Sequence, residues 1–487
     1  MLYHHFRANA QRWNDRAAIV CGERSASYGH LLSASERIGA RLRAAGIARG
    51  DAVVVLLPNG IDFACAVLGI LGIEAICVPL NTRFAAAEIR VYVENAQAKA
   101  LIHEREFAGM LDALAPHCAC FALFDGELEP TRAGTAESAS AAAHAGDPAA
   151  TYMYSSGSTG KPKRVMRTQG QWYAEYRALA ATVALSDSER FLCTIPLFHT
   201  HGFGNCLMAP LMSGSTLVIV PGEFNARTTV AALESHRTTV FPAVPFMFKM
   251  ISDTPFRKRP DLSTVRLSFS AGAALPEEVA RWFREHHGRP VRQLYGSTET
   301  GAVTINHDGP PGSESSVGRP LQGVEIDLLD EAGRAVAPDA IGEVAIRSPG
   351  MTRQYDGMPE LTAECFVGGY FLLGDLGSKD HDGRIYIRGR KKLLINVAGH
   401  KVDPLDVESM IRTLPWVSDV VVLGQSHAIY GEQVKAVIVP RDAVAREPQQ
   451  VVDYCARHLA EYKVPRVVEF RREIPKSPLG KILRKYL

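Results

Sequence analysis

The stretch TYMYSSGSTGKPKRVMRTQ, residues 151–169, joins an apolar lead-in to clustered hydroxyls, two glycines and four cations. Glycines let a backbone turn its N–H groups toward an anion, and hydroxyls and lysines complete such a shell. The stretch is not a Walker A loop, because Ser155 stands in place of the first glycine and Pro162 follows Lys161. Proline supplies neither a hydroxyl nor a backbone N–H. From these residues alone, the stretch is either an anion-binding loop or a solvated basic turn.

The bulk composition indicates a soluble chain of more than one domain. Its 487 residues are too many for one ordinary core, and 46% hydrophobic with 22% charged residues is a globular balance. With 54 basic and 52 acidic side chains, the formal net charge of +2 carries no signature of a nucleic-acid or anionic-membrane partner.

No targeting or membrane segment is expected. The first residues lack an apolar core of the signal-peptide type, and the longest apolar run, 63–80, contains Glu74 and reads as a buried helix followed by a strand. The nine cysteines form no CxxC pair, which favours free thiols over disulfides or a structural zinc site. We therefore expect a cytoplasmic protein.

Apolar runs alternate with amphipathic stretches, which predicts a layered α/β fold. The Ala-rich segment 132–150 is expected to be a surface connection. Buried strands are expected at 51–58, 75–80, 215–220, 238–244 and 265–272, and helices at 33–46 and 276–288.

The pattern changes twice toward the C-terminus. From Gly323 to Arg390, close-set strand runs separated by glycine-rich turns predict a smaller β-rich subdomain. Residues 391–487 show a helix, two strands and a helix, which predicts a small α+β domain. We expect a large N-terminal α/β domain over 1–390 and a boundary near Lys391–Lys392.

The segment YSSGSTGKPK, 154–163, closely resembles the phosphate-binding signature of the ANL superfamily, which contains acyl-CoA synthetases, peptide-synthetase adenylation domains and luciferases. The resemblance covers nearly the whole chain, because further motifs follow in the expected order. It implies an AMP-binding N-terminal domain and a mobile C-terminal domain. These motifs are IPLFHTHGFGN (195–205), SAGAAL (270–275), QLYGSTETG (293–301), YFLLGDLG (370–377), RGRKKLLINVAGHKV (388–402) and PKSPLGKILRKYL (475–487).

The resemblance also implies nucleotide contacts. Tyr295 would stack on adenine, Thr298 would contact the α-phosphate, and Asp375 would accept hydrogen bonds from both ribose hydroxyls. Glu299, together with Thr159, would hold Mg²⁺, a cation that prefers oxygen ligands and phosphate partners; taken alone, a glutamate after such a turn would be solvated. The full expected set for ATP and CoA is Ser155, Ser156, Gly157, Ser158, Thr159, Gly160, Lys163, Gly272, Ala273, Tyr295, Gly296, Asp375, Arg390 and Gly399.

An acyl pocket is implied as well, with His199 beside the substrate carboxylate. His201 is expected to be an ordinary core or surface histidine without a role in the site. The 195–205 segment lacks the Asp with which amino-acid-activating members hold the substrate ammonium, so we expect a fatty or aryl acid. The expected lining is His199, Phe203, Val244, Phe246, Gly272 and Gly301.

The C-terminal motifs imply a two-step ligase. Lys481 would be the catalytic lysine, Lys392 the hinge, and Gly399 part of the loop that admits a pantetheine arm; His400 and Lys401 are expected to be solvated. The departures are Leu373, where the family often has Thr, and Arg164, which could contact phosphate or point into water.

The implied reaction converts an acid and ATP to acyl-AMP and pyrophosphate, then transfers the acyl group to CoA. One alternative is a stand-alone enzyme that loads a separate carrier protein's phosphopantetheine. Another is a non-catalytic nucleotide-binding protein, disfavoured because Glu299, Asp375, Arg390 and Lys481 are all present. The protein would be a monomer or a homodimer.

Overall fold

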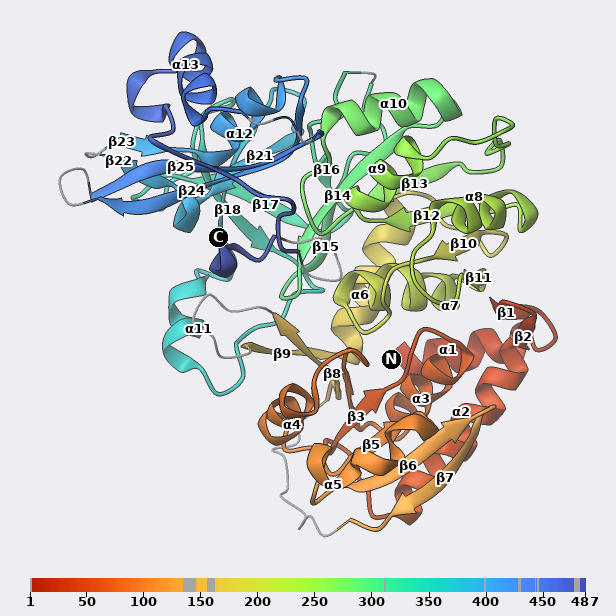
Figure 1. Ribbon diagram of the computed structural model, residues 1–487. Helices are drawn as coiled ribbons and strands as arrows, with labels where there is room; N and C mark the ends of the chain where they lie inside the picture. The colour runs from red at the N-terminus through yellow and green to blue at the C-terminus, as the bar shows by residue number, and fades with distance from the viewer. Residues whose placement is uncertain are drawn as a thin grey trace. The chain divides into compact units, whose positions relative to one another are not determined.

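The computed structural model describes residues 2–134, 146–155, 163–310, 312–397, 400–427, 431–442, 444, 446–476 and 482–487 (Figure 1). The chain divides into two compact units. The first contains Met1–Glu325 and Ile346–Phe371, and the second contains Ile326–Ala345 and Leu372–Leu487. The boundary expected near Lys391–Lys392 stays a prediction. No helix in the described part of the chain is long and apolar enough to cross a membrane.

A seven-stranded sheet, ordered β7-β6-β5-β3-β4-β8-β9, forms one half of the first unit. Its inner strands are parallel and almost wholly buried, which is why they are continuous apolar runs. The strands expected at 51–58 and 75–80 are confirmed. The bounds are β3 (Ala52–Leu56), β4 (Ile76–Pro79), β5 (Ala100–His103), β6 (Ala119–Phe124), β7 (Glu127–Arg132), β8 (Ala149–Ser155) and β9 (Lys163–Thr168).

A nine-stranded sheet, ordered β16-β15-β14-β13-β12-β10-β11-β1-β2, forms the other half. Its strands β1 and β10 to β14 are parallel to their neighbours within that set. The predicted strands at 215–220, 238–244 and 265–272 correspond to β11, β12 and β13. The bounds are β1 (Ala17–Cys21), β2 (Arg24–Ser27), β10 (Arg190–Cys193), β11 (Thr216–Ile219), β12 (Val240–Ala243), β13 (Leu267–Ser270), β14 (Val291–Ser297), β15 (Gly301–Ile305) and β16 (Arg319–Pro320).

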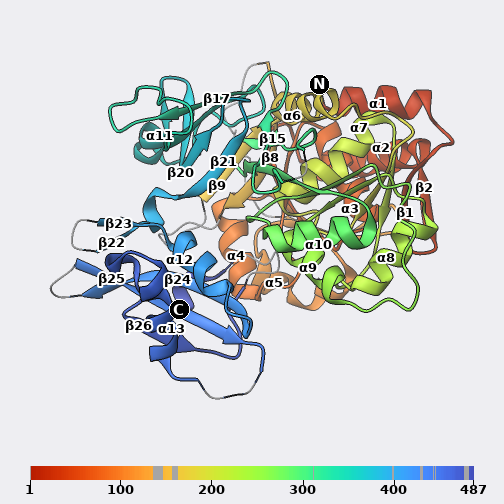
Figure 2. The ribbon, with the colours of Figure 1, turned by 90° about the horizontal axis from the view of Figure 1, so that it is seen from above.

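Helices lie between and outside these two sheets. α3 contacts β3 and β4 of one sheet and β1 of the other, and α6 contacts β9 and β15, so both helices lie between the sheets. α8, α9 and α10 lie side by side along the nine-stranded sheet (Figures 1 and 2). The expected helices at 33–46 and 276–288 are confirmed as α2 and α10. The bounds are α1 (Leu2–Arg12), α2 (Tyr28–Ala44), α3 (Ile61–Gly72), α4 (Ala86–Asn95), α5 (Leu111–Leu114), α6 (Gln169–Thr182), α7 (Ala209–Ser213), α8 (Ala226–Ser235), α9 (Pro245–Asp253), α10 (Glu277–His287) and α11 (Pro359–Cys365), with a π-helix at Gly202–Met208.

A five-stranded sheet follows, in the order β17-β18-β20-β19, with β21 pairing β20. The division into units falls within its strands. The β-rich stretch expected from Gly323 to Arg390 is confirmed. The bounds are β17 (Glu325–Leu329), β18 (Gly342–Arg347), β19 (Phe366–Val367), β20 (Tyr370–Lys379) and β21 (Ile385–Arg390).

The C-terminal part of the second unit is a sheet in the order β23-β22-β25-β24, with β26 parallel to β25. Helices α12 and α13 contact each other and the strands β24 and β26, respectively, around an apolar core. The expected helix–strand–strand–helix order is confirmed as α12, β24, β25 and α13, and the strands β22, β23 and β26 are additions to it. The bounds are β22 (Ile395–Val397), β23 (His400–Val402), α12 (Pro404–Arg412), β24 (Val417–His427), β25 (Gly431–Pro440), α13 (Pro448–His458) and β26 (Val467–Phe470).

Candidate active site

The predicted phosphate loop connects β8 and β9, which pair antiparallel with Ser155 opposite Lys163. The loop residues Ser156, Gly157, Ser158, Thr159 and Gly160 lie outside the described residues, and of Ser155 only the backbone is described. The chain therefore leaves the sheet at Ser155 and re-enters it at Lys163. The Lys163 Nζ lies 5.5 Å from the centroid of the Tyr355 ring.

The two arginines after the loop bind protein groups. Arg164 Nη2 lies 2.7 Å from Asp356 Oδ2, and its guanidinium covers the Tyr152 ring, 4.7 Å from the ring centroid. Arg164 therefore binds a protein carboxylate rather than pointing into water, and its contact with phosphate stays a prediction. Arg167 is fully buried and binds Glu175 Oε2 at 2.7 Å. Half of the four cations therefore bind acceptors elsewhere in the chain: Arg164 binds the half-buried Asp356, and Arg167 binds the buried Glu175.

The YGSTETG motif forms the connection between β14 and β15. The Glu299 side chain is buried, with 4% of the residue exposed, and it accepts a 2.9 Å hydrogen bond from the Tyr355 hydroxyl. The backbone carbonyl of Glu299 also accepts a hydrogen bond from Thr352 N, at 2.8 Å. Burial, and then the neighbouring Glu299 charge, raises the pKa of Tyr355, so its hydroxyl stays a donor. Glu299 is thus a fixed, buried carboxylate, unlike a solvated turn residue.

The rest of this motif is more accessible. Tyr295 and Thr298 are half-buried and Gly296 is exposed. The Ser297 and Thr300 hydroxyls close the turn, since Thr300 Oγ1 accepts from Ser297 N at 3.0 Å. This leaves the Tyr295 ring and the Thr298 hydroxyl reachable by a ligand, as stacking on adenine and contact with a phosphate would require.

The environment of Glu299 fits Mg²⁺. A carboxylate is a hard oxygen donor, and Mg²⁺ usually binds one or two carboxylates together with substrate phosphates. Within the described residues, no three His, Cys, Asp or Glu side chains gather into a complete metal site. Thr159, the second expected ligand, lies outside the described residues.

The segment before His199 is held by Asn59, which follows β3. Asn59 Nδ2 donates to Ile195 O and Asn59 Oδ1 accepts from Leu197 N, both at 2.8 Å. His199 itself is half-buried, and its Nδ1 accepts from His201 N at 3.3 Å. Sequence reasoning missed Asn59, since an asparagine between a proline and a glycine reads as an ordinary turn residue.

Of the two settings expected for His201, core or surface, the structure shows the core. Its Nε2 donates to Ala243 O at 3.2 Å, and its Nδ1 accepts from Asn205 Nδ2 at 2.9 Å. Burial lowers the pKa of His201 to about 4, because the charged ring would have to leave water. His201 is therefore neutral at pH 7.

The expected acyl-pocket residues fall into two groups. Val244 and Gly272 are neighbours, because a Cβ at Gly272, whose φ is +86°, would lie 3.9 Å from Val244 Cγ1. Phe246, two residues after Val244, is half-buried, and Ala273, directly after Gly272, is exposed. These residues follow β12 and β13, and they form an apolar margin at the carboxyl ends of those strands.

Phe203 and Gly301 belong to the interior in this structure. Phe203 is fully buried, with its ring centroid 4.7 Å from that of Trp172. Gly301 has a φ of +66° and is covered by Glu175, whose Oε2 would lie 2.3 Å from a Cβ added there. Close packing, rather than contact with an open surface, explains both residues, so their pocket role stays a prediction.

In the second unit, Asp375, the expected ribose contact, lies beside Arg390, which is expected to reach the ribose or a phosphate. Asp375 on β20 and Arg390 on β21 face each other across the strand pair, and Arg390 Nε lies 2.7 Å from Asp375 Oδ1. Asp375 is buried while Arg390 is half-exposed. Gly399, Lys481 and the Lys392 side chain lie outside the described residues, so nothing is added to their expected roles.

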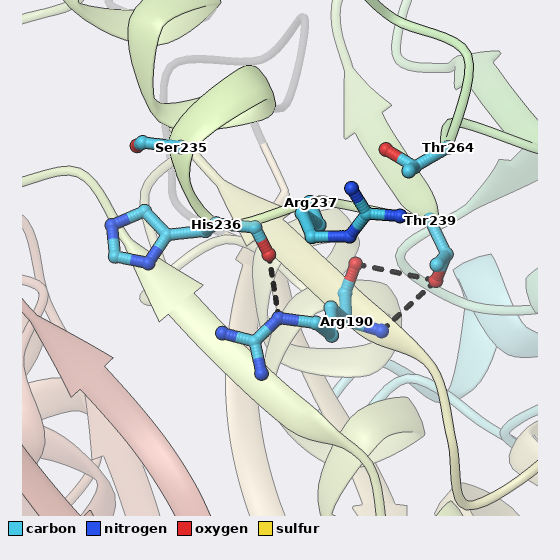
Figure 3. A pocket seen from close by; sticks show the side chains of 6 residues that line it. All are labelled: Arg190, Ser235, His236, Arg237, Thr239 and Thr264. Atoms are coloured by element: carbon cyan, nitrogen blue, oxygen red, sulfur yellow. Dashed lines mark hydrogen bonds between the residues drawn. The ribbon is translucent and has the colours of Figure 1, made fainter.

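Two surface hollows lie in the described part of the chain, and neither is lined by His199, Val244 or Gly272. One, of about 520 Å³, is lined by Arg190, Ser235, His236, Arg237, Thr239 and Thr264 (Figure 3). Arg190 begins β10 and Thr239 directly precedes β12, so this hollow opens at the amino ends of the parallel strands. His199, Val244 and Gly272 instead follow the carboxyl ends, where open α/β sheets bind ligands. The other hollow, of about 380 Å³, lies at the carboxyl end of β3 and includes Asn59.

Comparison with known proteins identifies the family. The model of the AMP-binding enzyme family matches residues 6–356, and that of the AMP-binding enzyme C-terminal domain matches residues 406–481. The chain belongs to the AMP-binding enzyme family. It is an adenylate-forming acid–thiol ligase of the ANL superfamily, of the acyl-CoA synthetase type, as the motifs predicted.

Named relatives span the whole chain. It is 31% identical to a 3-hydroxybenzoate–CoA ligase of Aromatoleum, over 97% of this chain and 93% of the relative. It is 30% identical to the long-chain-fatty-acid–CoA ligase FadD13 of Mycobacterium tuberculosis, over 95% and 92%. The crystal structure of ATP-bound MatB from Rhodopseudomonas palustris has a TM-score of 0.90 at 26% identity, over 100% of this chain and 98% of MatB.

Proposed function

We propose that the protein activates an aryl or fatty acid with ATP and transfers the acyl group to CoA. In the first step the carboxylate attacks the α-phosphate, forming acyl-AMP and releasing pyrophosphate. In the second, the CoA thiol attacks the acyl carbon and AMP leaves. The class of acid is supported by the apolar Val244 and Phe246 and by the missing Asp in segment 195–205. The curated relatives named above are CoA ligases, which favours CoA over a carrier protein as acceptor.

One observation carries this proposal. The Tyr355 side chain contacts both the buried Glu299 carboxylate, at 2.9 Å, and Lys163, the first described residue after the phosphate loop. A carboxylate able to hold Mg²⁺ and the base of a phosphate-binding loop therefore lie against the same side chain. ATP activation requires this pairing, because Mg²⁺ offsets the negative charge of the phosphates when it is bound.

The remaining roles follow from the motifs. The phosphate loop would hold the β- and γ-phosphates, Tyr295 the adenine and Thr298 the α-phosphate. Asp375 and Arg390 would hold the ribose hydroxyls, and their 2.7 Å ion pair orients the carboxylate. Lys481 would neutralise charge that develops on the attacking and bridging oxygens.

For the second step, we propose that the C-terminal domain rotates about Lys392. Lys481 would then leave the reaction centre, and the loop containing Gly399 would enter and leave room for the pantetheine arm of CoA. One centre would thus serve two reactions in turn, as in other hinge-type closures.

The test separates the two half-reactions. Lys481→Ala should abolish acid-dependent ATP–pyrophosphate exchange and spare thioester formation from supplied acyl-adenylate. Lys463→Ala is the control, because Lys463 is engaged by Asp406 at 2.7 Å in the same unit, and it should keep both activities. Equal loss of both half-reactions in Lys481→Ala would count against the proposed role.

A panel identifies the acid. Exchange is measured with fatty, aryl, dicarboxylic and amino acids, and we expect activity with an aryl or fatty member. Exchange with none of them would revive the non-catalytic alternative. Comparing CoA with a phosphopantetheinylated carrier in the second half-reaction tests the acceptor.

A further inference from the structure

Residues 350–356, here called the tyrosine segment, contact β9, the strand that follows the phosphate loop. Tyr355 forms an antiparallel bridge with Val165 of β9, so the segment continues the edge of the seven-stranded sheet. Arg164 binds Asp356 at one end of the segment, at 2.7 Å. Arg167 donates to Gly350 O at the other end, at 2.6 Å. Both arginines on β9 thus fix the segment to the strand that follows the loop.

The same segment fixes the candidate metal carboxylate. Thr352 N donates to the backbone carbonyl of Glu299 at 2.8 Å, and the Tyr355 hydroxyl donates to Glu299 Oε1 at 2.9 Å. Glu299 is therefore held at its backbone and at its side chain by two residues of one short segment. This arrangement restricts both the position and the orientation of the carboxylate.

The Tyr355 ring is itself held in place. Its centroid lies 5.9 Å from that of Phe366 and 6.4 Å from that of Phe371, with steep interplanar angles of 72° and 62°. The ring also lies under Lys163 Nζ, at 5.5 Å, within the range of a cation–π contact. Packing from the sides fixes the direction of the hydroxyl, and the ring face attracts the lysine at the exit of the loop.

We propose that Tyr355 is the positioning residue for the Mg²⁺–ATP complex. Its hydroxyl orients the Glu299 carboxylate, its ring places Lys163, and the tyrosine segment keeps the two at a constant separation. Hydrogen-bond partners of a metal-binding carboxylate set its orientation, and their loss typically weakens metal binding. This inference rests on the proposed role of Glu299.

The test uses Tyr355→Phe in the full-length protein, because this change removes the hydroxyl and keeps the ring. Mn²⁺ serves as the probe, and its binding in the presence of ATP is measured by electron paramagnetic resonance of the free ion. We expect the dissociation constant of Mn²⁺ to rise about 10-fold or more, in the range seen when such partners are removed. Thioester formation from supplied acyl-adenylate, which needs neither ATP nor the metal, should be unchanged.

Two further variants calibrate the result. Tyr386→Phe is the matched control, since Tyr386 also donates to a carboxylate, that of Asp380 at 3.1 Å, and its loss should leave Mn²⁺ binding unchanged. Asp356→Asn detaches the tyrosine segment from Arg164 and keeps Tyr355. We expect it to weaken Mn²⁺ binding in the same direction, by less.

The outcomes are distinct. Unchanged Mn²⁺ binding in Tyr355→Phe, with weak binding in Glu299→Gln, overturns the inference and leaves the role of Glu299 intact. Unchanged binding in Glu299→Gln refutes the metal role itself. A proportional loss of both half-reactions in Tyr355→Phe, with a lower melting temperature, assigns the tyrosine a merely structural role and also overturns the inference. If Tyr355→Phe does not fold, the test rests on Asp356→Asn, and wild-type Mn²⁺ binding in that variant would overturn the inference.

Discussion

The buried Arg167–Glu175 ion pair predicts a large loss of stability in Arg167→Met. Arg167 is fully buried, Glu175 is 5% exposed, and their charged atoms lie 2.7 Å apart. Methionine fills part of the space but leaves the Glu175 carboxylate with the Ala302 N–H, at 2.9 Å, as its remaining donor among the described residues. Breaking such a pair by removing one partner costs about 3–5 kcal/mol.

Urea unfolding followed by tryptophan fluorescence measures this deficit. The centroid of the Trp172 ring lies 3.8 Å from Arg167 Cζ, so the fluorescence of Trp172 reports directly on the ion pair. Arg167→Met with Glu175→Gln should recover most of the loss at pH 7, because no charge is then left buried. A deficit below about 1 kcal/mol at pH 7 would refute the reasoning.

Three other perturbations follow from the site. Asn59→Ala removes both hydrogen bonds to the segment before His199, worth about 1–1.5 kcal/mol, and should raise the acid KM in pyrophosphate exchange about 10-fold; an unchanged KM contradicts this role. The pKa of His201 is lowered to about 4 in the folded protein. The stability that its neutral form contributes is therefore complete above about pH 6.5, and up to about 3 kcal/mol of it is lost as pH falls to 4. His201→Gln should lack this loss in acid unfolding, and identical stability–pH profiles of the variant and the wild type would contradict the prediction. Gly202→Ala places a Cβ 2.1 Å from Pro196 O, so it should lower the free energy of unfolding by about 1–3 kcal/mol or more, measured by thermal unfolding. Gly109→Ala is the control and should leave stability unchanged, because nothing lies within 4 Å of a Cβ added there.

Local patterns were good predictors wherever one residue type has one environment. The runs at 51–58 and 215–220 were predicted as buried strands, because parallel strands covered on both faces contain almost no polar side chains. Arg167 shows the limit of such patterns. In the sequence it belongs to a basic cluster, yet it is buried, since its partners Glu175 and Gly350 O stabilise a charge that burial alone would exclude.

Tyr355 also shows the limit of local patterns, because its role cannot be read from its neighbours in the sequence. A tyrosine in a loop carries no functional signal, and its importance arises from Glu299 and Lys163, which lie 56 and 192 positions away along the chain. Phe203 and Gly301 were assigned to the substrate pocket by their motifs, and the structure buries both. Motifs place residues near a site, but packing sets which of their atoms face it.

The order of hydrophobic runs, turns and motifs was thus enough to establish the layered α/β fold, the C-terminal α+β unit and the family. These features depend on local composition and on the spacing of residues along the chain. Folding alone brings together Arg164 with Asp356, Asn59 with the segment before His199, and Tyr355 with Glu299. Such pairs join residues far apart in the chain, and they form because a buried polar group is stable only when a specific partner satisfies it.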